Sequence, residues 1–260
     1  KNKHKMILRR LGNKKKIAKE IQTYFPKHKI YIEPFFGAGG MFFNKPKAKY
    51  NILNDLDSDV FNLFKVVIDD LDKLVDAFYI MPIHSDLLEY WNNNIETDPI
   101  KKALRFLLLS NFVLNGRGSS LRGSSTEESK QNISKNLHET HEYLNNAKVM
   151  NFDFRDLFKK ISFRRQSEID GAFIYSDPPY LGTGDNYGNS FNEVDSTDLF
   201  DTLEETGCKF AMSEFDHPFI LSQAEKRGLN VIIIGERQNL KNRRTEILIT
   251  NYENRQQSLF

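Results

Sequence analysis

The sequence predicts an α/β fold: a mostly parallel, seven-stranded sheet with a reversed final strand in a β-hairpin, together with a long helical insertion. Three features indicate this class. Seven short apolar or alternating segments, typical of strands, recur along the 260 residues. Segments with helical periodicity fill most of the intervals between them. About ninety residues separate the second and third strand-like segments, which is far more than a connecting loop requires.

The elements of the predicted sheet follow one another along the chain. The strands are expected at Ile30–Glu33, Tyr50–Asn54, Val149–Phe152, Ala172–Ser176, Lys209–Ser213, Asn230–Ile234 and Thr245–Asn251. Helices are expected at Asn13–Tyr24, Ser196–Glu205 and Pro218–Lys226. About ten residues, GERQNLKNRR, join the last two strands without a helical pattern. Because a parallel return needs a crossover of about a dozen residues or more, these two strands are expected to pair antiparallel.

The long interval between strands two and three has helical periodicity of its own. It covers Val60–Phe78, Ile100–Leu114 and Glu127–Asn146, with a Gly/Ser-rich break, NGRGSSLRGSS. A segment of this length is expected to pack on itself. The sequence therefore predicts two domains: a sheet domain of residues 1–56 and 148–260, and an inserted helical domain of residues 57–147.

Composition limits the class of protein. Charged residues make up 28% and hydrophobic residues 39% of the chain, as in ordinary soluble globular proteins. Cys208 is the single cysteine, so an intramolecular disulfide and a zinc site built from cysteines are excluded. Because no apolar run approaches transmembrane length, we expect a cytoplasmic protein with no membrane partner. We also expect no bound metal, since the chain has no cluster of cysteine ligands.

Basic residues are concentrated near the start of the chain. Residues 1–29 contain eleven Lys or Arg and one acid, Glu20, and a second basic group, Lys241, Arg243 and Arg244, lies near the other end. Such patches can contact a polyanion such as nucleic acid. A solvated helix face and a frayed terminus explain each patch equally well.

A glycine-rich turn, EPFFGAGG, follows the first predicted strand. Gly37 and Gly39 allow a close backbone approach or a positive φ angle. A dinucleotide fingerprint needs a third glycine at position 42, which is Phe42. Asp55, at the end of the second strand, is placed to accept hydrogen bonds from ribose hydroxyls, whereas a helix N-cap would suit Asp57 or Ser58 better. Together these residues predict an adenosine-containing cofactor without a pyrophosphate.

The stretch FIYSDPPY ends the fourth predicted strand with an acid, two prolines and a tyrosine. Asp177 falls at the carboxyl edge of the sheet, where open α/β sheets bind ligands. Pro178 and Pro179 end the strand pairing and hold two acceptors, the Asp177 carboxylate and the Pro178 carbonyl, in fixed directions. Tyr180 adds a face on which a base can stack. These groups suit an exocyclic amine on a planar base.

The order of EPFFGAG (33–39) and DPPY (177–180), with a long insertion between them, resembles the Dam-type (alpha-class, D12) DNA adenine-N6 methyltransferase family. RTEILITNY (244–252) resembles the last strand of that family. The resemblance implies a Rossmann-like methyltransferase fold, S-adenosyl-L-methionine as cofactor, and DNA recognition by the insertion.

The resemblance also implies a role for particular residues. The catalytic residues are Asp177, Pro178, Pro179 and Tyr180. The cofactor-binding residues are Arg10, Lys14, Glu33, Phe35, Phe36, Gly37, Ala38, Gly39, Asp55, Asp153, Phe154, Asp177 and Tyr187. Candidate DNA-binding residues are Asn115, Arg117, Ser119 and Arg122. For the two arginines, exposed loop side chains are the alternative interpretation.

Three positions depart from the family pattern. Arg10 stands where an aromatic residue is usual, and Ser213-Glu214 stands where Ser-Asn is common. The segment after RFLLLSNFVLNG (105–116) does not reproduce that of GATC-specific members, so this specificity is not carried over.

The expected function is site-specific methylation of N6 of a flipped-out adenine in double-stranded DNA. The chain is expected to act as a monomer, with a cognate restriction endonuclease of a restriction-modification system as a partner that it does not contact. The alternatives are an RNA adenine-N6 methyltransferase and a catalytically silent DNA-binding protein of the same fold. Cytosine-C5 chemistry is disfavoured because Cys208 begins an apolar strand, as a core residue would.

Overall fold

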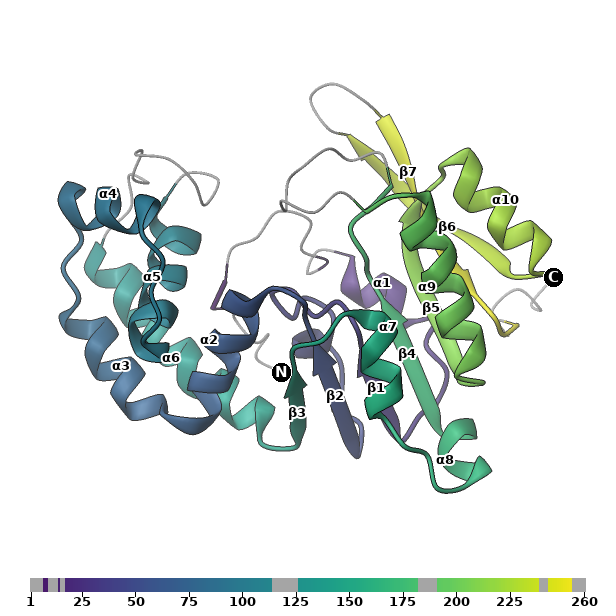
Figure 1. Cartoon of the computed structure of the whole chain (residues 1–260), viewed down its shortest axis with the longest axis horizontal. Coiled ribbons are helices and arrows are strands. Elements are labelled where there is room, and N and C mark those ends of the chain that lie inside the picture. The colour runs from purple at the N-terminus through teal and green to yellow at the C-terminus, as the bar shows by residue number, and fades with distance from the viewer. Residues whose placement is uncertain are drawn as a thin grey trace.

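A single seven-stranded sheet organises the protein, in a computed structural model that describes residues 7–8, 14, 17–113, 126–181, 191–238 and 243–253 (Figure 1). The strands are β1 (Ile30–Glu33), β2 (Tyr50–Asn54), β3 (Ala147–Met150), β4 (Ala172–Ser176), β5 (Lys209–Phe215), β6 (Asn230–Gln238) and β7 (Arg243–Thr250). Their order across the sheet is β3-β2-β1-β4-β5-β7-β6. Strand β7 runs antiparallel to both β5 and β6, and the pairs from β3 to β5 are parallel. The predicted fold class, including the reversed last strand, is confirmed.

Strands β1, β2 and β4 have the predicted bounds, whereas the ends of the other strands differ. Strand β3 lies two residues earlier than predicted because Phe152 leaves the ladder: its N–H donates to Asn54 Oδ1 at 3.0 Å. Strand β5 continues to Phe215 because it pairs with β7 as far as Glu246. Strands β6 and β7 are longer than predicted, so four residues, 239–242, separate them rather than about ten.

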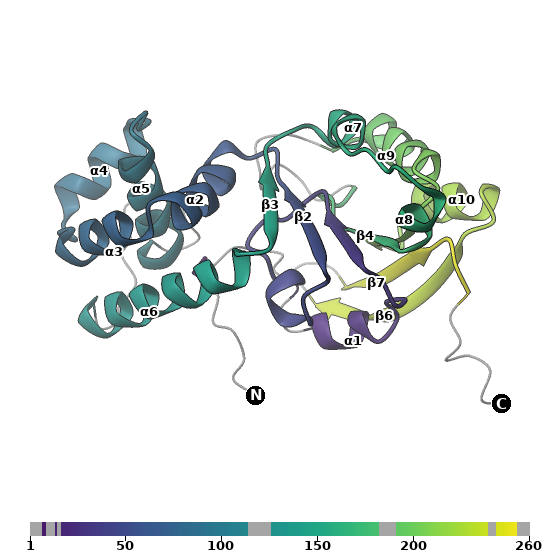
Figure 2. The same ribbon diagram turned by 90° about the horizontal axis from the view of Figure 1, so that it is seen from below.

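Helices cover both faces of the sheet (Figure 2). Helices α7 (Phe154–Leu157), α8 (Gln166–Asp170), α9 (Glu193–Glu205) and α10 (Pro218–Lys226) lie on one side, with the short η4 (Phe158–Lys160) after α7. Helix α1 (Ala18–Gln22) and η2 (Phe42–Asn44) lie on the other. Helix α1 ends before the predicted helix Asn13–Tyr24 does, because Thr23 and Tyr24 form a turn. Helix α10 has the predicted bounds, and α9 begins three residues early, at an Asn192–Asp195 capping box.

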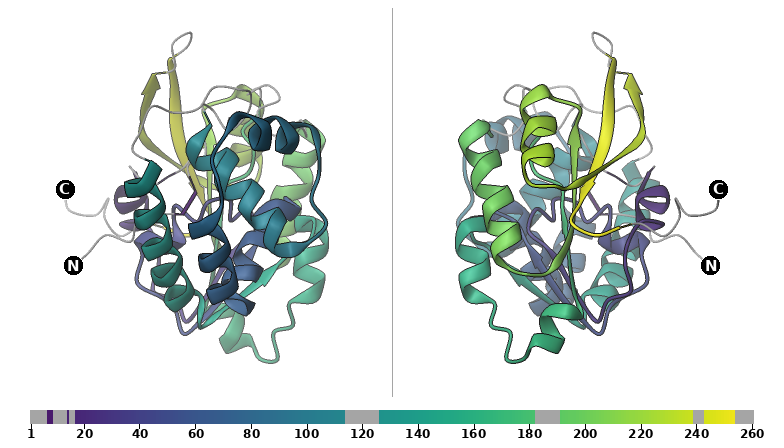
Figure 3. Two further views of the ribbon diagram at one scale, coloured as in Figure 1. Left: turned by 90° about the vertical axis from the view of Figure 1, so that its left-hand side faces the viewer. Right: turned by 90° about the vertical axis from the view of Figure 1, so that its right-hand side faces the viewer.

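In the described residues between β2 and β3, 55–113 and 126–146, the chain forms the helices α2 (Ser58–Asp69), α3 (Leu71–Ile80), α4 (Ser85–Asn93), α5 (Pro99–Phe112) and α6 (Thr126–Leu144). They gather as one group beside the sheet, and the left view of Figure 3 shows them in front of it. The expectation of a single helix at Val60–Phe78 is wrong, because the chain bends at Asp70 (φ −139°, ψ 40°) and starts a second helix. Helix α4 was not predicted; its apolar side is short, with Leu88 and Trp91 buried.

The inserted helices share a hydrophobic core with one face of the sheet. Phe36, after β1, packs edge-on against Phe64 of α2 with ring centroids 4.8 Å apart. Phe43 approaches Tyr143 of α6 in the same way at 5.8 Å. The buried residues of this face and of the insertion form one continuous cluster, and the face under α7, α9 and α10 forms a second cluster. Among the helices of the described ranges, none has the length and apolar character to cross a membrane.

Candidate active site

The glycine-rich turn after β1 takes the conformation that its sequence predicts. Gly37 and Gly39 have φ angles of 54° and 74°, a region that favours glycine. The Gly39 N–H donates to the Phe36 carbonyl at 2.8 Å, which closes the turn. A Cβ atom on Gly37 would meet no atom within 4 Å, so the backbone there has open space beside it.

Asp55 fixes this turn against the end of the adjacent strand β2. Its Oδ2 accepts the Gly37 N–H at 2.6 Å, and its Oδ1 accepts the Asp57 N–H at 2.9 Å. Asp57 is the N-cap of α2, as expected, so Asp55 does not cap a helix. The half-buried Asp55 carboxylate therefore lies beside the open backbone of Gly37 at the carboxyl edge of the sheet.

Asn54 is a site residue that the sequence analysis missed. Its amide Nδ2 donates to the carbonyls of Pro34 and Phe152, at 3.0 and 2.9 Å, and its Oδ1 accepts the Phe152 N–H. One buried side chain thus ties together the ends of three strands, β1, β2 and β3. A buried amide at a strand end is the signal that could have identified it.

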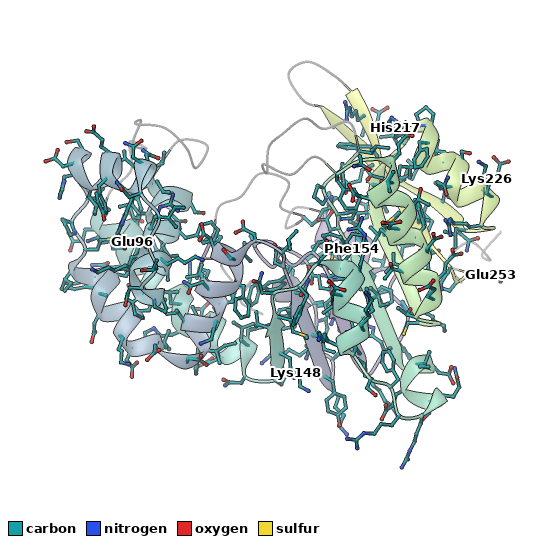
Figure 4. All side chains as sticks on the ribbon, viewed as in Figure 1. Glu96, Lys148, Phe154, His217, Lys226 and Glu253 are labelled. Carbon is teal, nitrogen blue, oxygen red and sulfur yellow. The ribbon has the colours of Figure 1, made fainter. Side chains whose placement is uncertain are left out.

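Aromatic rings from three segments meet near the end of β3. The ring centroids of Phe35, Phe154 and Phe191 lie 5.7 to 6.1 Å from one another. Phe154 begins α7 at the carboxyl edge, where Figure 4 labels it. The preceding Asp153 caps α7 through the Arg155 N–H at 2.9 Å. Such apolar faces beside a carboxylate suit a purine that carries an amino group.

Arg155 holds this corner together and was also missed by sequence reasoning. Its guanidinium pairs with Asp153 at 3.2 Å and, on α9, with Asp195 at 2.6 Å and Asp198 at 2.8 Å. The same group lies 4.4 Å from the centroid of the Phe154 ring. These charge-assisted contacts raise the pKa of Arg155 and attach α7 to α9.

Glu33 at the end of β1 is buried and hydrogen-bonds to a residue of its own strand. Its Oε2 accepts the hydroxyl of Tyr31 at 2.8 Å. Burial raises the pKa of Glu33 well above its ordinary value, and the Tyr31 hydrogen bond opposes that rise. Tyr31 therefore orients Glu33 within the sheet.

The Asp177–Tyr180 segment leaves the sheet at the end of the fully buried strand β4. The Asp177 side chain is 20% exposed, and burial raises its pKa. The Tyr180 ring stands edge-on to Phe215 with centroids 4.6 Å apart, and its hydroxyl donates to Glu246 Oε1 at 3.1 Å. The carboxylate, the two prolines and the aromatic ring thus lie at one edge of the sheet, as predicted.

Lys14 joins Asp177 to a second carboxylate. Its buried ammonium, with 3% of the side chain exposed, lies 3.2 Å from Asp177 Oδ1 and 2.6 Å from Glu246 Oε1. It also donates to the Tyr180 hydroxyl, and it lies 4.4 Å from the centroid of that ring. Lys14, expected among cofactor-binding residues, is thus packed against the predicted catalytic segment. Glu246 was not predicted to belong to the site.

Glu214, the departure from the family's Ser-Asn pair, lies beside the same segment. Its Oε1 accepts the Phe215 N–H at 2.8 Å and its Oε2 accepts the Leu181 N–H at 3.3 Å. Burial raises its pKa to about 8, although both N–H donors oppose the rise. At neutral pH the group is therefore largely protonated and uncharged, as an asparagine would be.

Several predicted residues fall outside the described parts of the chain. They are Arg10 and Tyr187 of the expected cofactor site, and Asn115, Arg117, Ser119 and Arg122 of the expected DNA contacts. The described residues Phe35, Phe36, Gly37, Ala38, Gly39, Asp55, Asp153 and Phe154 lie at the ends of β1, β2 and β3. Strand β1 pairs with both β2 and β4, so these residues adjoin the Asp177 segment.

Comparison with known proteins gives the family of this chain. Residues 11–247 match the model of the D12 class N6 adenine-specific DNA methyltransferase family. A type II methyltransferase, M1.LlaDCHI, of Lactococcus lactis subsp. cremoris is 26% identical over 94% of this chain and 94% of its own length. The DNA adenine methylase of Haemophilus influenzae is 30% identical over 68% of this chain and 64% of its own length.

Among solved structures, the rRNA methyltransferase aviRa of Streptomyces viridochromogenes covers 94% of this chain, and the match covers 89% of aviRa. Its TM-score of 0.42 and 9% identity are too low for this likeness to bear on function. The family match, in contrast, spans most of the sequence and includes both the glycine turn and the Asp177–Tyr180 segment. The chain belongs to the D12 class N6 adenine-specific DNA methyltransferase family, whose members methylate N6 of adenine in DNA.

Proposed function

We propose that this chain transfers the methyl group of S-adenosyl-L-methionine to N6 of an adenine that has been flipped out of duplex DNA. The observation that carries the proposal is the position of the Asp177–Tyr180 segment. The segment follows β4, which pairs with β1 and its glycine turn. Strand β2, which Asp55 follows, lies on the other side of β1. Acceptors for an amine and groups suited to a nucleoside therefore share one end of the sheet.

The residues of this edge fit an adenosine-containing cofactor. The Asp55 carboxylate, held by Gly37 and Asp57, would accept the ribose hydroxyls. The rings of Phe35, Phe154 and Phe191 would cover the adenine of the cofactor. The Asp153 carboxylate would accept a hydrogen bond from the adenine amino group. When bound, S-adenosyl-L-methionine supplies an electrophilic methyl group.

The residues at the end of β4 would prepare the target amine. The adenine N6 lone pair is delocalised into the ring, which makes N6 a poor nucleophile. Asp177 and the Pro178 carbonyl would each accept one N6 hydrogen, which favours a tetrahedral nitrogen and stabilises the positive charge that develops on it. As N6 takes the methyl group, sulfur would keep the electron pair of the broken carbon–sulfur bond, and N6 would release one proton to solvent.

The remaining contacts would bring DNA to this edge. Because N6 of a paired adenine is not accessible, the base must leave the helix, and Tyr180 would replace its lost stacking. The insertion, including Asn115, Arg117, Ser119 and Arg122, would contact bases and phosphates. We propose a monomer that acts on duplex DNA. The type II name of the Lactococcus relative supports a cognate endonuclease that recognises the same site without touching this chain.

Replacement of Asp177 by alanine tests the proposed function. We expect Asp177→Ala to lose methyl transfer to duplex DNA, measured with labelled cofactor, while calorimetry still detects cofactor binding. Asp170→Ala is the matched control, because Asp170 is exposed and precedes β4 at the opposite edge of the sheet. Direct sequencing of the modified DNA identifies the methylated base and its site.

Three results would contradict the proposal in distinguishable ways. Normal methylation by Asp177→Ala would remove Asp177 from catalysis. Methylation of an RNA strand but not of the duplex of the same sequence would identify an RNA enzyme. A wild-type chain that binds DNA but no S-adenosyl-L-methionine would be a silent DNA-binding protein.

A further inference from the structure

Glu246 brings a buried carboxylate into the active site from the reversed strand. It lies on β7, opposite Phe215 of β5, and only 2% of its side chain is exposed. Its Oε1 accepts hydrogen bonds from Lys14 Nζ at 2.6 Å and from the Tyr180 hydroxyl at 3.1 Å. Both partners belong to the site described above, and Tyr180 is 66 residues away in sequence.

Lys14 is shared between two carboxylates rather than paired with one. Its Nζ is closer to Glu246, at 2.6 Å, than to Asp177, at 3.2 Å. A buried charge without a partner is strongly destabilising, so an ammonium at this depth requires a counter-charge. Glu246 supplies it, and the negative charge of Asp177 is then only partly compensated by Lys14.

The sharing of the Lys14 charge between Glu246 and Asp177 affects how strongly Asp177 can accept the hydrogens of the target amine. A carboxylate that a lysine fully neutralises attracts a developing positive charge less strongly than one that is partly neutralised. Tyr180 donates to Glu246 and accepts from Lys14, so these two residues orient its ring. The contacts of Glu246 therefore reach both the acceptor and the aromatic ring.

We propose that Glu246 is a positioning residue for methyl transfer: by holding Lys14 and Tyr180, it keeps the Asp177 carboxylate available to the target amine. The inference rests on the proposed function, since it assigns to Asp177 the role of acceptor. Glu246 itself does not touch the substrate in this scheme. It acts through Lys14, Asp177 and Tyr180.

Removal of the charge on Glu246 should change the titration of Asp177. The titratable groups that interact with Asp177 are Lys14, Tyr31, Glu33, Tyr175, Tyr180, Glu214 and Glu246. Of these, Glu246 raises the pKa of Asp177 and Lys14 lowers it. In Glu246→Gln, Lys14 would pair with Asp177 alone, so the Asp177 pKa should fall.

The test compares Glu246→Gln with Glu225→Gln, the same change at an exposed position on α10. For Glu246→Gln we expect kcat to fall about tenfold or more, the cost of a misplaced catalytic group, while cofactor affinity by calorimetry stays close to that of the parent. The acidic limb of the kcat profile, measured from about pH 5 to about pH 9, should move to lower pH. Glu225→Gln should change neither quantity. An unchanged kcat and an unmoved limb in folded Glu246→Gln would overturn the proposal.

A double-mutant cycle keeps the proposal testable if Glu246→Gln folds poorly. Lys14→Met with Glu246→Gln removes both members of the buried Lys14–Glu246 pair, so neither of these two charges is left without the other. Because Glu246 acts through Lys14 as well as through Tyr180, the double variant should keep more activity than the product of the two single losses predicts. Independent, multiplying losses would overturn the proposal. A wild-type chain that does not methylate adenine would instead reject the proposed function, before any Glu246 variant is compared.

Discussion

Glu214 shows how burial changes the chemistry of a single side chain. An acid at this position would normally place a negative charge beside Asp177. Because burial raises its pKa to about 8, Glu214 is largely uncharged at neutral pH and accepts backbone N–H groups from Phe215 and Leu181. An acidic residue thus replaces an amide here without adding a full charge to the site.

This shift predicts how stability depends on pH. Folding strengthens proton binding by Glu214, from an ordinary pKa of 4.5 to about 8. Proton binding by Glu214 therefore adds its whole contribution to the free energy of unfolding below about pH 4.5. The contribution decreases between about pH 4.5 and about pH 8, and it is lost at higher pH. Glu214→Gln should weaken this decrease, as measured by urea unfolding at several pH values. Glu225→Gln is the control, and a wild-type slope in Glu214→Gln would show that Glu214 does not bind the proton.

The turn after β1 shows what one element requires of its residues. Gly39 has both a positive φ angle and no room: an added Cβ would lie 2.3 Å from the Phe43 ring and 2.9 Å from the Phe36 ring. Gly37 has a positive φ angle but open space. A side chain at Gly37 would therefore cause backbone strain alone, whereas a side chain at Gly39 would cause backbone strain and a steric clash.

Alanine at each glycine should show this difference. Gly37→Ala is expected to lower the free energy of unfolding by about 1 kcal/mol, the cost of a left-handed conformation. Gly39→Ala should cost about 1 to 3 kcal/mol more, because the aromatic rings must move. Urea unfolding without cofactor measures both. Equal losses in the two variants would mean that the rings at Gly39 give way freely.

Helices of the insertion show where local pattern was insufficient. The apolar periodicity of Val60–Phe78 continues through Asp70, so it predicted one helix where α2 and α3 are two. The break is visible as a change of direction, which lets both helices pack against α5 and α6. Apolar periodicity indicates which side of a helix is buried. Two consecutive helices that pack against the same core can therefore continue one apolar pattern across the break between them.

At the scale of the whole molecule, the insertion and the sheet share a core. Phe64 of α2 contacts Phe36 in the turn after β1 and Phe43 in η2. Truncation of Phe64 removes packing from both parts at once. The helices between β2 and β3 therefore complete the core of one sheet face, and the division into two domains stays a prediction.

Phe64→Ala tests this coupling. We expect a loss of about 3 to 5 kcal/mol in the free energy of unfolding, as for other large-to-small changes in a core. The fluorescence of Trp91, the single tryptophan, reports on the insertion, and hydrogen exchange of β4 and β5 amides reports on the sheet. Both signals should change at the same denaturant concentration in the wild type and in the variant. Tyr79→Ala, at an exposed position on α3, should have little effect, and separate transitions would contradict a shared core.

Short-range patterns in the chain were enough to predict the strands β1, β2 and β4, the hairpin of β6 and β7, and the residues Gly37, Asp55 and Asp177 at the ends of their strands. These depend on burial and backbone conformation, which neighbouring residues largely impose. The contacts of Asn54, Arg155, Glu214 and Glu246 depend instead on which helices and strands lie side by side. Glu246 reaches Lys14 and Tyr180 because β7 inserts in reverse between β5 and β6, a pairing of segments far apart in sequence. Whether a buried acid is ionised, shared or protonated follows from those neighbours, and therefore from the folded arrangement of the sheet.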